Sequence, residues 1–164
     1  MLANVVQANA LTPPLDAQAE QDGLHVIYDL AELNLPFVYS AAQASNRLIQ
    51  ENPRLVQRFV AALAEAVYFT ERNPQTARQA LGKVLDLQDS AALDSAYNAY
   101  ARKLVNRELT VPREAVQASI DTVRDSGAPV TKGAAAIVDN RFADDLAATG
   151  FLRQLWGTDP PGRN

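Results

Sequence analysis

Cysteine is absent from the 164-residue sequence, and histidine occurs once, as His25. Without cysteine the chain has no disulfide bond, no thiolate nucleophile and no cysteine-ligated zinc. A single histidine argues against a histidine-rich metal site and against a Ser-His-Asp triad. The sequence alone therefore predicts neither catalytic residues nor a metal site.

Other familiar signals are missing as well. No stretch of about 18 apolar residues is present, so we expect no transmembrane segment. Residues Met1 to Leu11 lack a basic region ahead of an apolar run, so the chain as given shows no signal peptide. The seven glycines are scattered and form no phosphate-binding loop. Lys and Arg number 15 against 19 Asp and Glu, a net charge of −4 without a basic run, which argues against nucleic acid as a partner.

The densest group of carboxylates is Asp139, Asp144 and Asp145. A metal site needs ligands that converge from other segments, and the sequence supplies none visibly. Helix capping and a solvated helix face explain these residues better. We therefore expect no metal and no cofactor.

The sequence has two regions that differ in the secondary structure they predict. Residues 1–42 hold three short β-forming runs, Val5–Leu11, His25–Leu30 and Phe37–Ala41, and a short helix, Leu15–Gln21, that Asp22-Gly23 ends. A strand, a helix and a further strand predict a small βαβ unit. Residues 43–156 read as helical, and residues 157–164 as a flexible tail.

The helical region has clear start signals. A capping residue or a proline predicts the beginning of each of five helices, at Asn52-Pro53, Asn73-Pro74, Asp89-Ser90, Pro112 and Asp139. A last apolar turn, Phe151–Trp156, follows Gly150. The predicted fold class is therefore a helix-rich α/β protein, with a short βαβ unit followed by about five helices.

Two short segments are candidate ligand-binding sites. Thr12-Pro13 follows a predicted strand and precedes a helix, which is where open parallel sheets bind ligands. Tyr39-Ser40 ends another predicted strand with two hydrogen-bonding side chains. A plain turn and a plain strand end remain the alternatives.

The order of segments resembles a known family. The runs ALTPPLDAQAEQDGLHVIYDLAEL, RLIQENPRLVQRFVAALAEAVYFTERNPQTARQAL and VDNRFADDLAATGFLRQLW together resemble the C-terminal half of ABC-transporter substrate-binding proteins. The branch is the one that captures sulfonates, nitrate, taurine and thiamine precursors, the thiamine-pyrimidine-synthase-like superfamily. Within these runs, E-N-P-x-x-V, N-P-x-x-A and D-N-R-F carry the similarity.

This resemblance implies a partial periplasmic-binding-protein type II fold, in which two α/β lobes close on a small-molecule solute. Residues 1–42 would be a remnant of the second lobe and the hinge, and residues 43–156 the helical part of the first lobe. The positions that match the cleft edge, and hence the implied ligand-binding residues, are Thr12, Pro13, Tyr39 and Ser40. The resemblance also implies a periplasmic location, docking on an ABC permease and no enzymatic activity.

One departure from the family is large. Family members are roughly twice as long, and the N-terminal half has no counterpart here. We therefore expect either a homo-oligomer or a missing N-terminal half that covers exposed apolar helix faces. The alternatives are a helical protein-interaction or oligomerisation module without a ligand and, less favoured, a pyrimidine-synthase-like enzyme.

Overall fold

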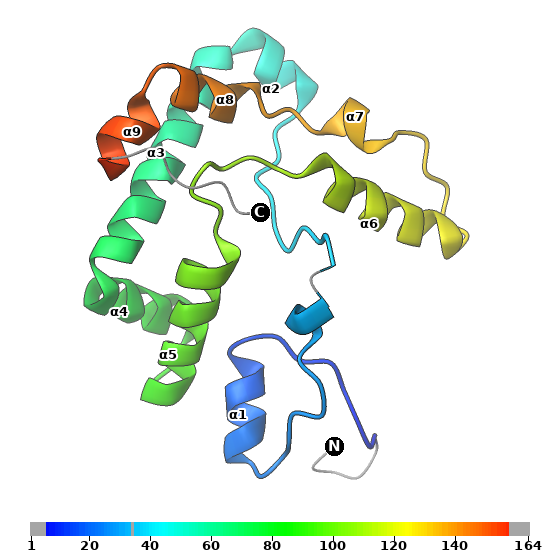
Figure 1. The fold of residues 1–164 in the computed structure, drawn as a ribbon, viewed down its shortest axis with the longest axis vertical. Helices are drawn as coiled ribbons and strands as arrows, with labels where there is room; N and C mark the ends of the chain where they lie inside the picture. Colours follow the sequence, from blue (N-terminus) through cyan, green and yellow to red (C-terminus); the bar gives the residue numbers. More distant parts are fainter. Residues whose placement is uncertain (1–5, 34, 158–164) are drawn as a thin grey trace. The chain divides into compact units, whose positions relative to one another are not determined.

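A computed structural model describes residues 6–33 and 35–157, and across these ranges the chain is helical with no strand. The elements are shown in Figure 1 and have these bounds: α1 (Leu15–Gln21), the 3-10 helix η1 (Leu30–Leu33), α2 (Asn46–Glu51), α3 (Pro53–Arg72), α4 (Pro74–Leu85), α5 (Ser90–Tyr97), the π-helix η2 (Asn98–Leu104), α6 (Arg113–Asp125), α7 (Ala134–Ile137), α8 (Arg141–Ala148) and α9 (Phe151–Trp156). In the described part of the chain no helix is both long and apolar enough to cross a membrane.

The predicted βαβ unit, and with it the α/β periplasmic-binding-protein type II fold, is wrong for the described residues. The runs at His25–Leu30 and Phe37–Ala41 are irregular, and Leu30 begins η1 instead. The run Val5–Leu11 is irregular from Val6 onward, and Val5 lies outside the described residues. A strand is stable only when a neighbour pairs with its N–H and C=O groups. None of the three runs pairs with another, so β propensity alone does not produce strands here.

The chain divides into two compact units. Unit 1 comprises Met1–Asp29 and Thr70–Leu104, and unit 2 comprises Leu30–Phe69 and Val105–Asn164. The predicted flexible tail, 157–164, lies outside the described residues from 158 onward.

Unit 1 has a small core at α4, α5 and η2. The buried side chains there are Ala77, Tyr97 and Ala101, and the partly buried Leu81 packs on them. The hydroxyl of Tyr97 donates to the carbonyl of Thr70 at 3.2 Å, which satisfies the polar end of a ring that is only 3% exposed. The predicted helix Leu15–Gln21 is confirmed as α1 and packs against α5.

Unit 2 has its core where α3 meets α8 and α9. Ala64, Leu146 and Leu152 are buried there. Among the described residues Leu152 is the one large side chain that is fully buried, at 1% exposed. Trp156 meets the ring of Tyr68 edge-on, with the ring centres 5.1 Å apart. The lone tryptophan thus packs the last turn against the core of its unit.

The predicted helix starts are largely confirmed. Helices α3 and α4 begin at Pro53 and Pro74, directly after an asparagine. Proline suits the first helical position because its missing N–H has no intrahelical partner there. The short helix α7 has no counterpart among the five predicted helix starts.

The start of α8 differs slightly from the prediction. Asn140, not Asp139, occupies the capping position, and Asp139 accepts a hydrogen bond from the backbone N–H of Arg141 at 3.3 Å. Gly150 has a φ of +78° between α8 and α9, a conformation that residues with a side chain rarely adopt. The predicted stop at Gly150 is therefore confirmed.

Candidate functional site

The turn that contains Thr12 and Pro13 leads into α1 in unit 1. The backbone N–H of Leu15 donates to the carbonyl of Thr12 at 3.0 Å and closes the turn. The hydroxyl of Tyr100, in η2, donates to the carbonyl of Pro13 at 2.6 Å. Thr12 is exposed and Pro13 is half-buried. The turn is thus held against a helix 87 residues further along the chain.

A hollow of about 510 Å³ lies between α1 and α5 of the same unit. Its lining residues are Asp16, Ala17, Glu20, Gln21, Ala91 and Ser95. The two carboxylates are four residues apart, so they lie on the same face of α1. No basic side chain lines the hollow, so its electrostatic character is acidic.

Asp89 links the two helices beside this hollow. Its Oδ1 caps α5 by accepting from the backbone N–H of Ala92 at 2.7 Å, and it also accepts from Nε2 of Gln21 at 3.0 Å. The backbone N–H of Ala92, and after it the amide of Gln21, hold the pKa of Asp89 below its usual value. Asp89 therefore stays ionised at neutral pH and adds negative charge beside the hollow.

The hollow is wide open to solvent, and this limits what it does alone. Pockets that hold small molecules bury most of the ligand surface, about 70–90%. The α1–α5 hollow is too open to enclose a solute in this way. A group with N–H donors or positive charge is favoured beside Asp16 and Glu20, whereas an anion is repelled.

Tyr39 and Ser40 belong to unit 2, in an irregular segment between η1 and α2. Tyr39 is 46% exposed, and Ser40 is exposed as well. The four residues predicted to bind a ligand thus form two adjacent pairs, one in each unit. Thr12 and Pro13 belong to the turn that precedes α1, but neither residue lines the hollow.

The other candidate residues considered in the sequence analysis lie at the surface. His25 and the carboxylate cluster Asp139, Asp144 and Asp145 are exposed. No group of three or more His, Asp or Glu side chains suited to hold a metal ion occurs in the part of the chain that the structure describes.

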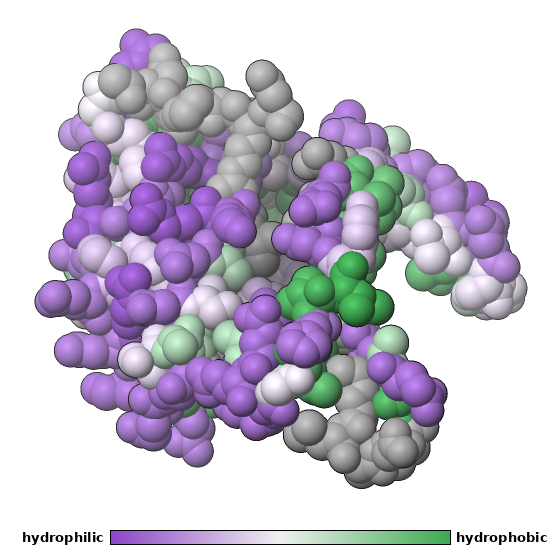
Figure 2. All heavy atoms as spheres, turned by 60° about the horizontal axis from the view of Figure 1, so that its bottom comes forward, coloured by the Kyte–Doolittle hydropathy of each residue, from purple (hydrophilic) through white to green (hydrophobic). Residues whose placement is uncertain are grey.

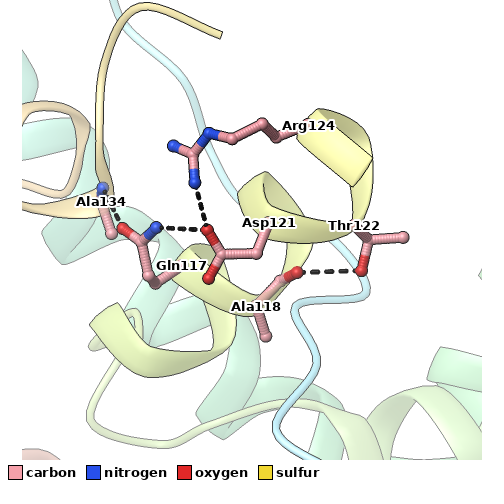
Figure 3. A network of polar contacts seen from close by, with 6 residues as sticks. All are labelled: Gln117, Ala118, Asp121, Thr122, Arg124 and Ala134. Carbon is pink, nitrogen blue, oxygen red and sulfur yellow. Dashed lines mark hydrogen bonds and ion pairs between the residues drawn. The ribbon is translucent and has the colours of Figure 1, made fainter. Parts of the chain in front are cut away.

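Two polar side chains, Asn140 and Gln117, join separate segments of unit 2 by hydrogen bonds. Neither of them was identified as a candidate from the sequence. The amide of Asn140 pairs with the backbone of Val111: Oδ1 accepts from the N–H at 2.9 Å, and Nδ2 donates to the carbonyl at 3.0 Å. Gln117 joins α6 to α7, because its Oε1 accepts from the backbone N–H of Ala134 at 3.0 Å (Figure 3). Both partners are distant in sequence, so no local signal could have revealed them.

Gln117 is itself held in place by an ion pair. Its Nε2 donates to Asp121 Oδ1 at 2.9 Å, and the same oxygen accepts from Nη1 of Arg124 at 2.7 Å (Figure 3). The spacing of these residues along α6, at i, i+4 and i+7, puts all three on one side of the helix. Their role is to fix the connection between α6 and α7.

Comparisons with protein-family models, with curated proteins and with solved structures found no match to this chain.

Proposed function

We propose that this chain is the solute-binding component, or part of it, of an ABC importer for a small organic or anionic solute. The observation that carries the proposal is the ordered set of segments from ALTPPLDAQAEQDGLHVIYDLAEL to VDNRFADDLAATGFLRQLW. The same resemblance implies a periplasmic location and an ABC permease as partner, and we include both in the proposal. Because the α1–α5 hollow is open to solvent, we expect this chain to bind its solute weakly.

The motif residues that carry the resemblance have structural roles in this chain. In E-N-P-x-x-V and N-P-x-x-A, the Asn-Pro pair begins α3 or α4, and the final residue, Val56 or Ala77, is the first buried position of its helix. In D-N-R-F, Asn140 binds the backbone of Val111 and Phe142 is buried. Each motif thus combines a helix start with an anchoring contact, which gives a physical reason for its residues.

The charge of the hollow narrows the class of solute. Of the solutes that the resemblance implies, sulfonates and nitrate are anions, whereas a thiamine precursor of the aminopyrimidine type carries N–H donors. The carboxylates of Asp16 and Glu20 accept hydrogen bonds and repel anions. The aminopyrimidine class therefore suits unit 1 best.

A thermal-shift titration tests the proposal. We expect a 4-aminopyrimidine to raise the melting temperature, and taurine or nitrate at equal concentration to raise it less. The double variant Asp16→Asn/Glu20→Gln should lose this response. Asp144→Asn/Asp145→Asn, which removes two exposed carboxylates from α8, should keep it. A flat response to every solute would contradict solute binding by this chain.

A second candidate function is a helical protein-interaction or oligomerisation module. Large apolar side chains are exposed along the segment that joins α1 to α2, and Figure 2 shows hydrophobic residues at the surface of the molecule. The most exposed are Ile27 at 84%, Phe37 at 71% and Leu35 at 69%. Exposed large apolar side chains that lie close together mark interaction sites in soluble proteins, and Leu35 and Phe37 are such a pair in unit 2. A monodisperse monomer in light scattering, without binding to a dye for apolar surfaces, would contradict this candidate.

A further inference from the structure

Helix α3 has two apolar faces, and only one of them is used within unit 2. Val60 and Ala64 lie on the face that packs on α8 and α9. A second stripe consists of Leu55, Phe59, Ala62 and Ala66, at spacings of four, three and four residues. This alternation is the pattern of a helix-pairing seam. Leu55 and Phe59 are each 55% exposed, and both alanines are exposed too.

The stripe is complementary to a reversed copy of itself. Its first two residues are large and its last two are small. When two α3 helices lie antiparallel, Phe59 faces Ala62 of the second copy, and Leu55 faces Ala66 of the second copy. Each large side chain then fills the space above a small one, as well-packed interfaces require. Because a two-fold axis relates the copies, every contact forms twice.

The charges beside the stripe favour the same register. Arg58 and Glu65 flank it on one side and are seven residues apart, or about two helical turns. In the antiparallel arrangement just described, Arg58 lies across from Glu65 of the second copy, and Glu65 lies across from its Arg58. Opposite charges at such flanking positions set the partner and the orientation of paired helices.

Competing arrangements lose both kinds of complementarity. A shift of the antiparallel pair by seven residues places Glu65 across from Glu65 of the second copy, and Ala62 across from Ala66. A parallel pair in register stacks Phe59 on its own copy and Ala62 on its own copy, which leaves a gap. One register alone therefore combines matched volumes with matched charges.

We propose that two copies of this chain associate through α3, antiparallel, with Phe59 of each copy against Ala62 of the other. This proposal deepens the interaction-module candidate and is independent of solute binding. A seam of one helix from each copy is small compared with stable interfaces, which bury about 1,200–2,000 Å². The dimer is thus expected to dissociate on dilution.

Sedimentation equilibrium over a concentration series tests the pairing. The wild-type chain should show a reversible monomer–dimer equilibrium. Arg58→Glu and Glu65→Arg should each raise the dimer dissociation constant about tenfold, because each change turns two attractions into two repulsions. The double variant Arg58→Glu/Glu65→Arg should restore the wild-type value. The control Arg54→Glu reverses a charge on α3 further from the stripe and should leave the dissociation constant unchanged.

Each of the other outcomes overturns the proposal. If the wild-type chain stays monomeric at all concentrations, the two α3 helices do not pair. A dimer that neither single variant weakens uses another surface, such as the apolar segment before α2. Failure of the double variant to restore the dimer refutes the register. Circular dichroism of every variant, each at an exposed position, checks that the fold is retained.

Discussion

Leu152→Ala should be the most damaging truncation in unit 2. The side chain is 1% exposed and lies with Ala64 and Leu146 where α3, α8 and α9 meet. The change removes three buried carbon atoms, and at about 0.8 kcal/mol per methylene the lost transfer free energy is about 2.4 kcal/mol. The cavity left behind adds to this value. We therefore expect a loss of about 3 kcal/mol in the free energy of unfolding, within the range for buried leucines.

Urea denaturation, followed by far-ultraviolet circular dichroism, measures this loss. Leu35→Ala is the matched control, because it makes the same chemical change at a side chain that is 69% exposed. We expect the control to change the free energy of unfolding by less than about 0.5 kcal/mol. If the two variants unfold at the same urea concentration, the packing of α9 against α3 does not stabilise unit 2 and the reasoning fails.

Two further predictions concern polar contacts. Asn140→Ala should lower the free energy of unfolding by about 1–3 kcal/mol, because it removes both hydrogen bonds to Val111 and leaves partly buried backbone groups unpaired. Urea denaturation measures this loss against the exposed control Asn46→Ala. Equal stability of the two variants would contradict the prediction. The Ala92 N–H and Gln21 lower the pKa of Asp89 in the folded chain. The ionised carboxylate therefore stabilises the fold at any pH above its pKa in the unfolded chain, about 3.9. This stabilisation is lost as the pH falls through the lower pKa of the folded chain. The melting temperature of Asp89→Asn should accordingly lie below that of the wild type at pH 7 and converge with it under acid, whereas a difference independent of pH would refute the role of the charge.

Helix starts were readable from the sequence because the signals that set them are local. Pro53 and Pro74 occupy the first positions of α3 and α4, and Asp89 caps α5 by accepting from the backbone N–H of Ala92. Ser45 does the same for α2, where its hydroxyl accepts from the N–H of Leu48 at 3.1 Å. Such contacts involve residues three or four apart, so their sequence signature survives in any tertiary setting.

The prediction of strands failed because, unlike a helix start, a strand depends on a partner that lies elsewhere in the chain. The run at His25–Leu30 has β-forming residues, yet β propensity measures how well a side chain packs on a sheet that already exists. In the described chain no neighbouring strand offers that sheet. The apolar side chains Val26, Ile27 and Tyr28 consequently stay exposed, at 59%, 84% and 53%.

The candidate site was also only partly predictable. The sequence predicts a turn at Thr12-Pro13, but the hydroxyl that anchors the turn belongs to Tyr100 in a distant helix. Such a contact leaves no local pattern. The residues that line the hollow, Asp16 and Glu20, look in sequence like an ordinary solvated helix face. Only the packing of α1 against α5 turns that face into the wall of a hollow.

The distribution of buried and exposed side chains connects the two proposals. Most buried hydrophobic residues of the described chain are alanines, whereas the larger apolar side chains Ile27, Phe37 and Phe59 lie more than half exposed. Alanine buries little area, so each unit gains little hydrophobic stabilisation from its own core. The area that could stabilise the chain further is on its surface and becomes useful only when another polypeptide covers it. A partner on the exposed segment before α2 and pairing through α3 would both cover such surface, and the charge variants at Arg58 and Glu65 distinguish between them.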